Sequence, residues 1–397
     1  MNPRVVHVTT VDMSVRHLLL NQLLALKEGG FDVAAMSAPG HDLEPVHAAG
    51  VRHFAVPFTR RLTPLEDLKA FVRMWRLFRR ERFTIVHTHQ AKAALFGQMA
   101  ARLAGVPIVI NTLHGFYFHD RTPRAKRRGW IALERLQARF SDLILSQSPE
   151  DVETAVAEGI CDRDRIEWLG NGIDISRFDR ARVSEDARLR LRLKLGIAAN
   201  AKVVGFVGRL VREKGIIELF DAFRRAREAV GDARLLVVGP VDSDKADAVS
   251  PQTAVEHGID DAIFVGYRDD TPALYALMDV CALPSHREGF PRSPMEASAM
   301  GVPCIATAIR GCRQTVFPER NGLLVPVRDP IALADALVRI LSDDELRLRM
   351  SAEARRLAEA AFDERRVFGR VADAYRRLLD RKGLSNIADA ASVPTSR

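Results

Sequence analysis

A chain of 397 residues that is 47% hydrophobic and 28% charged can bury two cores, which excludes a disordered or fibrous protein. Its formal net charge of +8 fits an anionic partner, but does not distinguish a nucleotide from a nucleic acid or a membrane surface. The four cysteines lack CxxC and zinc-ligand spacing, which predicts reduced thiols in the core and a cytosolic type of compartment. Because the N-terminus has no signal-peptide pattern and no window has about 18 uninterrupted apolar residues, we expect neither export nor a membrane span.

The first half of the chain alternates short β-branched runs with helical patterns. Strands are expected at residues 5–11, 32–38, 85–89 and 107–114, and helices at residues 18–27 and 91–103. This alternation is typical of βα units around a parallel sheet.

The same rhythm recurs after a polar, arginine-rich helical stretch at residues 184–195. Strands are expected at residues 203–207, 233–238, 262–265, 280–283 and 303–307, and helices at residues 215–229, 272–277 and 293–300. The sequence therefore predicts an α/β protein with two doubly wound, Rossmann-like lobes. In such a pair the cleft between the lobes is the default ligand site.

The end of the chain is expected to be helical, at residues 331–341, 344–361 and 364–379. The last helix places Val367, Val371, Tyr375 and Leu378 on one face, which would allow it to cross back to the first lobe. We therefore predict a first domain at residues 1–180, a second at residues 181–362, the returning helix at residues 363–380 and a frayed tail at residues 385–397.

The strongest motif runs from His286 to Glu296 and reads His-Arg-Glu-Gly-Phe-Pro-Arg-Ser-Pro-Met-Glu. Ser293 is the expected N-cap of a helix, and Pro294 in the first turn would place Glu296 in the opening helical turn. A carboxylate held there can accept two hydrogen bonds from a ribose, and nearby free backbone N–H groups can meet a polyol or a phosphate. The pattern suits a sugar nucleotide. The alternative is that Glu296 caps its own helix and Glu288 is a solvated loop acid.

A second motif, Gly-Phe-Val-Gly-Arg-Leu-Val-Arg-Glu-Lys-Gly, occupies residues 205–215 after the first expected strand of the second lobe. Glycines let the backbone approach a ligand closely, and Arg209 and Lys214 supply cations beside it. Such cations would stabilise the negative charge that a diphosphate leaving group develops. Since this glycine spacing alone is weak evidence, a solvated Lys214 is the alternative.

Together these segments resemble the retaining glycosyltransferases of family 4, which have the two-lobed GT-B architecture. The resemblance covers nearly the whole chain and includes capsular, exopolysaccharide and lipid-linked-oligosaccharide glycosyltransferases. The motifs that carry it are Val86-His87-Thr88-His89, Leu113-His114-Gly115, Asn171-Gly172-Ile173-Asp174, Gly208-Arg209 with Lys214-Gly215, Pro284-Ser285 with Glu288-Gly289-Phe290-Pro291, Glu296-Ala297, Gly301-Val302-Pro303 and Asn321-Gly322-Leu323-Leu324-Val325.

The resemblance implies transfer of a hexose or N-acetylhexosamine from a nucleotide sugar, most simply a UDP-sugar, with retention and with no bound metal or other cofactor. It implies that Glu296 holds the ribose, and that Glu288 holds the donor sugar with the backbone of Gly289, Phe290 and Pro291. Because the motifs contain no obvious nucleophile, we favour same-face attack assisted by the leaving phosphate over a covalent intermediate.

The resemblance also assigns roles around the leaving group. Arg209 and Lys214 would bind the diphosphate, and His114 would approach the reacting centre from the first lobe. We therefore expect His114, Glu288, Arg209 and Lys214 to be the catalytic residues. Tyr267 and Arg268 resemble the position where relatives meet the nucleotide base, with an ordinary surface turn as the alternative.

The first βα loop departs from the family pattern. Many relatives carry a glycine pair that touches the phosphates, whereas residues 9–16 contain no glycine. Ser14 and Arg16 are candidates to replace it as phosphate or acceptor contacts. His87, His89 and His119 are expected to line the acceptor side. A zinc site made by these histidines and His114 is the weaker alternative, because no cysteine or carboxylate completes a tetrahedral set.

Positive charge is concentrated in residues 52–139, which hold 18 Lys and Arg against 5 Asp and Glu. Apolar residues such as Met74, Trp75 and Phe78 interleave with the arginines of residues 60–82, and a second cluster spans Arg121–Arg128. This mixture suits an anionic membrane surface or a lipid diphosphate. The alternative is that the aromatic side chains pack inward and the arginines are merely solvated. Nucleic acid is not expected, since no nucleic-acid-binding motif is found.

We therefore expect a glycosyltransferase that is cytoplasmic and peripheral on the inner face of the cytoplasmic membrane. Its acceptor would be a polyprenyl-diphosphate-linked or other glycolipid in the assembly of bacterial surface glycans. The donor would bind mainly to the second lobe and the acceptor to the first. Two alternatives remain: a sugar-nucleotide epimerase that needs no acceptor, and a noncatalytic protein that binds a sugar nucleotide or a membrane.

Overall fold

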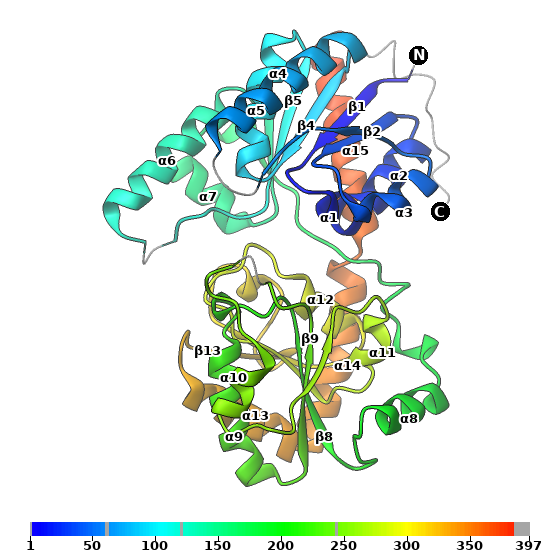
Figure 1. Cartoon of the computed structure of the whole chain (residues 1–397), viewed down its shortest axis with the longest axis vertical. Coiled ribbons are helices and arrows are strands. Elements are labelled where there is room, and N and C mark those ends of the chain that lie inside the picture. Colours follow the sequence, from blue (N-terminus) through cyan, green and yellow to red (C-terminus); the bar gives the residue numbers. More distant parts are fainter. Residues whose placement is uncertain (1, 60–62, 120–121, 243–244, 385–397) are drawn as a thin grey trace. The chain divides into compact units, whose positions relative to one another are not determined.

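The computed structural model describes residues 2–59, 63–119, 122–242 and 245–384 (Figure 1). It divides into two compact units: unit 1 comprises Met1–Gly170 and Arg365–Arg397, and unit 2 comprises Asn171–Glu364. The expected tail at residues 385–397 lies outside the described residues, as do Arg60, Arg61 and Arg121 of the cationic clusters.

Unit 1 is built on a seven-stranded parallel sheet with the order β3-β2-β1-β4-β5-β6-β7. Its strands are β1 (Arg4–Val8), β2 (Asp32–Ser37), β3 (Arg52–Ala55), β4 (Ile85–His89), β5 (Ile108–Leu113), β6 (Leu143–Ser146) and β7 (Ile166–Trp168). Its helices are α1 (Asp12–Ser14), the π-helical turn η1 (Val15–Leu19), α2 (Leu20–Glu28), α3 (Glu44–Ala48), α4 (Pro64–Glu81), α5 (Ala91–Leu103), α6 (Arg124–Ala138), α7 (Pro149–Ala157) and α15 (Glu364–Arg381), with short 3-10 turns at His41–Leu43 and Arg163–Arg165.

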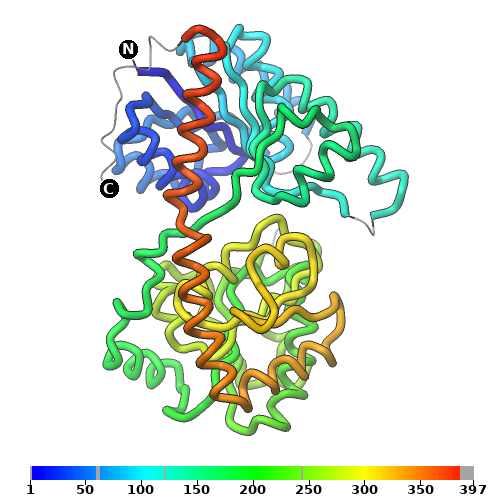
Figure 2. The backbone as a smooth tube through the Cα atoms, turned by 180° about the vertical axis from the view of Figure 1, so that it is seen from behind, coloured from blue at the N-terminus to red at the C-terminus, as the bar shows by residue number. Residues whose placement is uncertain are grey.

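Both faces of the unit 1 sheet are covered by helices. Alternate residues of β1 and β4 point to opposite faces, so that Val5 and Ile85 pack with α2 and α15, while Val6 and Val86 pack with α4 and α5. Figure 2 shows α15 running along this sheet, and its Tyr375 is fully buried there. Helix α15, at the far end of the chain, is therefore part of the core of unit 1.

Unit 2 contains a six-stranded parallel sheet with the order β10-β9-β8-β11-β12-β13. Its strands are β8 (Lys202–Val207), β9 (Ala233–Val238), β10 (Ile263–Gly266), β11 (Val280–Leu283), β12 (Cys304–Thr307) and β13 (Gly322–Val325). Its helices are α8 (Glu185–Lys194), α9 (Ile216–Val230), α10 (Pro251–Glu256), α11 (Thr271–Tyr275), α12 (Arg292–Ala299), α13 (Pro330–Ser342) and α14 (Asp344–Ala361), with 3-10 turns at Arg180–Arg182, Arg212–Lys214 and Cys312–Gln314.

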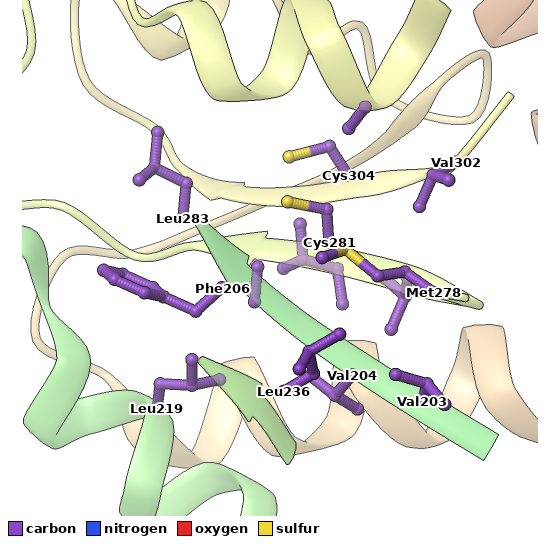
Figure 3. Packing of buried hydrophobic residues seen from close by; sticks show 14 of the residues in the cluster. Val203, Val204, Phe206, Leu219, Leu236, Met278, Cys281, Leu283, Val302 and Cys304 are labelled. Atoms are coloured by element: carbon purple, nitrogen blue, oxygen red, sulfur yellow. The ribbon is translucent and has the colours of Figure 1, made fainter. Parts of the chain in front are cut away.

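The core of unit 2 is packed around β8 and β11 (Figure 3). Cys281 and Cys304 lie opposite each other on β11 and β12, and all four cysteines of the chain are free. A Cβ atom on Gly205 would lie 2.0 Å from Sδ of Met278, so only glycine fits there without a shift. The two parallel sheets with their helices confirm the predicted α/β class with two doubly wound lobes. Among the described residues, no helix is both long enough and apolar enough to cross a membrane.

Candidate functional site

The two predicted motifs of unit 2 meet at the carboxyl ends of its strands. Strand β8 lies between β9 and β11, so the loops that follow these three strands are neighbours. The backbone N–H of His286 donates to the carbonyl of Glu213 at 2.8 Å, and Arg287 forms an ion pair with the Glu213 carboxylate at 2.8 Å. The loops at residues 208–215 and 284–291 are thus joined directly, which is where a parallel α/β sheet binds ligands.

A cation and an acid form the centre of this edge. Nζ of Lys214 lies 2.5 Å from Oε1 of Glu288, and the hydroxyl of Ser285 donates to the same oxygen at 2.7 Å. Only 19% of the Lys214 side chain and 10% of the Glu288 side chain are exposed. Oε2 of Glu288 has no hydrogen bond to the described residues, which leaves this oxygen for a ligand hydroxyl.

Two backbone donors lie beside this pair. Among the described residues, the N–H groups of Gly289 and Phe290 donate no hydrogen bond, whereas the Phe290 carbonyl accepts one from the Asn171 amide at 3.1 Å. A Cβ atom on Gly311 would lie 2.4 Å from the Gly289 carbonyl oxygen. Gly311, which sequence reasoning missed, therefore lets the loop after β12 support the Gly289 backbone.

Gly215 controls how closely the two motifs approach. It has φ = +70°, and a Cβ atom on it would lie 1.9 Å from the carbonyl oxygen of Pro284. The left-handed conformation and the close approach both require glycine. Gly215 therefore closes the turn that brings Lys214 to Glu288.

Arg209 lies on the same edge, but in a different environment. Its Nη1 atom lies 2.6 Å from Oδ2 of Asp242, which follows β9, and its side chain is 44% exposed. No hydrogen bond or ion pair joins Arg209 to Lys214 or Glu296 in the described part of the chain. Sequence reasoning missed Asp242 because nothing in the sequence places the end of β9 beside the Arg209 loop.

Glu296 is held by α12 and by a tyrosine from α11. The hydroxyl of Tyr275 donates to Oε2 of Glu296 at 3.0 Å. Burial, followed by the Glu296 charge, raises the pKa of Tyr275 well above its ordinary value, so this hydroxyl stays a donor. Tyr275 is the third residue of this site that sequence reasoning missed, since its sequence context is that of an ordinary core residue.

The start of α12 corrects one prediction. The helix begins at Arg292 after Pro291, without a side-chain cap, so Ser293 is not its N-cap. Extended backbone at Pro291 (φ −71°, ψ 133°) leads directly into the helix. Glu296 is consequently the fifth helical residue, beyond the opening turn.

Tyr267 and Arg268 follow β10 at the edge of the sheet. The Tyr267 hydroxyl donates to Asp269 at 2.8 Å, and Nε of Arg268 lies 2.7 Å from Asp270. The Tyr267 side chain is largely exposed. The contact of Tyr267 and Arg268 with a nucleotide base therefore stays a prediction.

The predicted histidines of unit 1 form a buried cluster with a member that sequence reasoning missed. His87 and His89 on β4 are fully buried, beside His7 on β1 and Tyr375 on α15. The prediction that His87 and His89 line the acceptor side is therefore wrong, because their period-two spacing points both side chains into the core below α15. His114, just beyond β5, is only partly buried and ends the cluster.

Burial keeps these rings neutral. It lowers the pKa of His7 to about 3 and that of His114 to about 4, and it lowers the pKa values of His87 and His89 well below the ordinary range. Among the described residues, His7, His87 and His89 form the single group whose ligand atoms lie close enough together for a metal, within 4.8 Å. All six of their ring nitrogens already take part in hydrogen bonds within the protein. His119, part of the zinc alternative, is exposed and outside this group.

The glycine-free first loop is held by Gln90. This residue has φ = +68°, a conformation that non-glycine residues rarely adopt, directly after β4. Its side chain accepts from the Thr10 N–H at 3.2 Å and donates to the Ser14 hydroxyl at 2.8 Å. Arg16 pairs with Asp42 at 2.9 Å. Ser14 and Arg16 are thus both engaged within unit 1, and their predicted ligand contacts remain predictions.

Helix α4 turns its apolar and cationic residues to different sides. Met74 and Phe78 are buried, whereas Arg73, Arg76, Arg79 and Arg80 are exposed. Two apolar residues, Leu65 and Leu68, are nevertheless 76% and 58% exposed. Between this helix and β3 lies a groove of about 870 Å³, whose basic lining residues are His53, Lys69, Arg73, Arg76 and Arg80. The surface is amphipathic and strongly cationic.

Both units match known protein families. Residues 188–357 match the model described as glycosyl transferases group 1, and residues 15–172 match the model of a glycosyl transferase 4-like domain. These matches include the unit 2 loops at residues 208–215 and 284–291 as well as Gln90 and His114 of unit 1, but they begin at residue 15, after most of the glycine-free first loop.

Individual relatives agree with these models. The chain is 28% identical over 351 residues to a UDP-Gal:alpha-D-GlcNAc-diphosphoundecaprenol alpha-1,3-galactosyltransferase of Escherichia coli, covering 87% of this chain and 89% of that protein. It is 31% identical over 334 residues to a GDP-mannose-dependent alpha-mannosyltransferase of Mycobacterium tuberculosis, covering 82% of each chain. The crystal structure of Anabaena Alr3699/HepE in complex with UDP and glucose matches with a TM-score of 0.81 at 21% identity, covering 95% of this chain and 100% of that one.

Proposed function

We propose that this chain, which belongs to the group 1 glycosyltransferase family, transfers a hexose or an N-acetylhexosamine from a UDP-sugar to a lipid-linked acceptor. The observation that carries the proposal is the Lys214–Glu288 pair beside the free N–H groups of Gly289 and Phe290. A cation, an acid and two backbone donors at one sheet edge match the diphosphate and the hydroxyls of a nucleotide sugar.

In this proposal each group has a separate task. Lys214 and Arg209 bind the diphosphate and stabilise the charge that develops as the sugar leaves. Oε2 of Glu288 and the N–H groups of Gly289 and Phe290 hold the sugar, while Glu296 accepts hydrogen bonds from the ribose hydroxyls. Tyr267 and Arg268 flank the base, and His114 acts on the transferred sugar. No metal and no other cofactor is required in this proposal.

Stereochemistry is the second part of the proposal. Lys214 and Ser285 both donate to Oε1 of Glu288, and the positive charge of Lys214 lowers the nucleophilicity of the whole carboxylate. We therefore favour retention through same-face attack, with the leaving phosphate oxygen accepting the acceptor's proton. A glycosyl-enzyme trapped and detected by mass spectrometry would contradict this route.

The acceptor proposal follows from the Escherichia coli relative and from the α4 surface. That relative's name states an undecaprenyl-diphosphate-linked acceptor, and the α4 groove combines basic side chains with exposed leucines. We propose a polyprenyl-diphosphate-linked or other glycolipid acceptor and peripheral binding to an anionic membrane, on its inner face.

The donor test is a thermal-shift panel of UDP, GDP, UDP-galactose, UDP-N-acetylglucosamine and GDP-mannose. A ligand that binds the native state raises the melting temperature, so UDP and one UDP-sugar should shift it. Transfer is then measured with that donor and GlcNAc-diphosphoundecaprenol in micelles. A shift with GDP-mannose alone would overturn the choice of base, an epimer formed without acceptor would indicate an epimerase, and no shift with any nucleotide would contradict the whole proposal.

The membrane test is co-sedimentation with vesicles that contain anionic lipid. The paired change Arg73→Gln and Arg76→Gln should weaken binding, most strongly at low salt. The matched control removes the same charge from α8 of unit 2, by Arg188→Gln and Arg190→Gln. Equal binding by both variants, or binding that is independent of salt, would refute the role of α4.

A further inference from the structure

The buried histidines of unit 1 form one linear chain of hydrogen bonds that ends at His114. Its links are Thr112 Oγ1 to His87 Nε2 (2.7 Å), His87 Nδ1 to the Tyr375 hydroxyl (2.6 Å), Tyr375 to His7 Nε2 (3.0 Å), His7 Nδ1 to His89 Nε2 (2.9 Å) and His89 Nδ1 to His114 Nε2 (3.1 Å). The chain draws on β1, β4, β5, the loop after β5 and α15.

The number of hydrogens restricts this chain to two states. A neutral imidazole has one donor and one acceptor nitrogen, and a phenol donates one hydrogen. The four interior members, His87, Tyr375, His7 and His89, therefore supply four hydrogens to five links. The fifth must come from one end, either from Thr112 or from His114. All donors consequently point the same way, either toward His114 or away from it.

The surroundings of the Thr112 end select one direction. If the donors pointed away from His114, the buried Thr112 hydroxyl would be an acceptor, and its own hydrogen would have no acceptor among the described residues. An unmet buried donor costs about 1–3 kcal/mol. The buried Thr112 hydroxyl therefore favours donors that point from Thr112 toward His114.

We propose that this chain fixes His114 as the neutral tautomer that carries its hydrogen on Nδ1, with Nε2 accepting from His89. His114 would then meet the transferred sugar as a neutral hydrogen-bond donor rather than as a base. Tyr375, His7, His89, His87 and Thr112 are positioning residues in this arrangement. This role explains why histidines occur on the same face of β1 and β4 as the buried apolar residues Val5 and Ile85. The effect on transfer rests on the proposed function, whereas the tautomer does not.

The direct test is ¹⁵N NMR of the histidine-labelled full chain above pH 7. We expect the His114 signals of an Nδ1–H tautomer in the wild type. Tyr375→Phe removes the central hydroxyl while keeping the ring, so it should convert His114 to a mixture of tautomers. Thr154→Val is the matched control, because it removes a hydroxyl that bonds only within α7. A wild-type Nε2–H tautomer, or an unchanged His114 spectrum in Tyr375→Phe, would overturn the proposal.

Transfer kinetics test the consequence separately. Tyr375→Phe should lower kcat about 5- to 50-fold and leave KM for the nucleotide sugar unchanged. The substitution changes the position of the hydrogen on the His114 ring, but it removes no contact with the nucleotide. An asparagine amide reproduces an Nδ1–H donor, so His114→Asn should keep more activity than His114→Gln and should be insensitive to Tyr375→Phe. A His114 tautomer as proposed, combined with kcat unchanged in every variant, would contradict the positioning role and the proposed task of His114 while leaving the donor site intact.

Discussion

Nζ of Lys214 and Oε1 of Glu288, which are 74 residues apart in the sequence, lie 2.5 Å from each other at the carboxyl edge of the unit 2 sheet. The pair is largely buried, and Ser285 donates to the same oxygen. Lys214 therefore neutralises Glu288, and in the proposed function the same cation also binds the diphosphate. A buried acid loses its stabilisation when its cation is removed.

Lys214→Met should accordingly lower kcat for transfer on the order of 10²–10³-fold, since it removes a cation that stabilises the leaving group. The diphosphate contact is lost too, so the thermal shift caused by UDP should decrease. Lys202→Met is the matched control, because Lys202 pairs with Asp344 on an exposed surface of the same unit. Full activity in Lys214→Met would rule out its place in the diphosphate site.

Gly311→Ala should weaken binding of the donor sugar, and it should do so without changing the charge of the site. Its Cβ atom would lie 2.4 Å from the Gly289 carbonyl, so the backbone that presents the Gly289 and Phe290 N–H groups must move. We expect KM for the nucleotide sugar to rise about tenfold, corresponding to about 1.4 kcal/mol. Gly369→Ala, in α15 with nothing within 4 Å of the added atom, should leave KM unchanged. An unaltered KM in Gly311→Ala would mean that this loop does not support the sugar.

Periodicity and glycine spacing were sufficient to predict two parallel sheets and the bounds of several elements, but not the strands β3, β6, β7 and β13. The expected β4, α5, β9, β11 and α14 have the observed ends, because βα units carry strong local signals. The expected strand at residues 5–11 is shorter in the structure, since Asp12 already begins α1. Glu288 and Lys214 were also found from the sequence, because they lie in loops whose spacing is a motif.

The partners of these residues could not be found in the same way. Asp242, Tyr275 and Gly311 reach the site through strand order and tertiary packing, which a single sequence does not encode locally. His87 and His89 show the opposite error. Their polar character suggested a ligand-facing surface, but period-two geometry places both beneath α15, where Tyr375 and His7 satisfy them. The burial of these polar side chains is explained only by their hydrogen-bond partners, which the sequence does not show.

The neutral histidines should make the protein sensitive to acid. The pKa values of His7 and His114 are lowered to about 3 and about 4, whereas an unfolded histidine titrates near 6.5. The unfolded state therefore binds protons first, so the stability that these groups contribute is complete above pH 6.5 and falls as the pH decreases below it. Each group adds up to about 1.4 kcal/mol per pH unit to this slope.

Denaturant unfolding at pH 5, 6 and 7 measures the slope. His7→Leu should reduce total stability, because it breaks the hydrogen-bond chain, but it should make the pH dependence shallower. His119→Gln changes an exposed histidine and should leave the slope as it is. A slope that is unaffected by His7→Leu would show that this ring is protonated in the native state.

Glu134 should produce the opposite pH dependence. This residue of α6 is buried, and burial together with the nearby Asp151 raises its pKa to about 7. Since an unfolded glutamate titrates near 4.3, the stability linked to its protonated form is complete below that value and is lost as the pH rises through 7. Glu134→Gln keeps the shape and removes the charge, so at pH 8 it should raise the free energy of unfolding by on the order of 1–3 kcal/mol. At pH 4 the two proteins should be equally stable.

Glu150→Gln, on α7, is the control for the loss of one negative charge in the same unit. A stabilisation by Glu134→Gln that is the same at both pH values would show that the pKa of Glu134 does not differ between the folded and unfolded states.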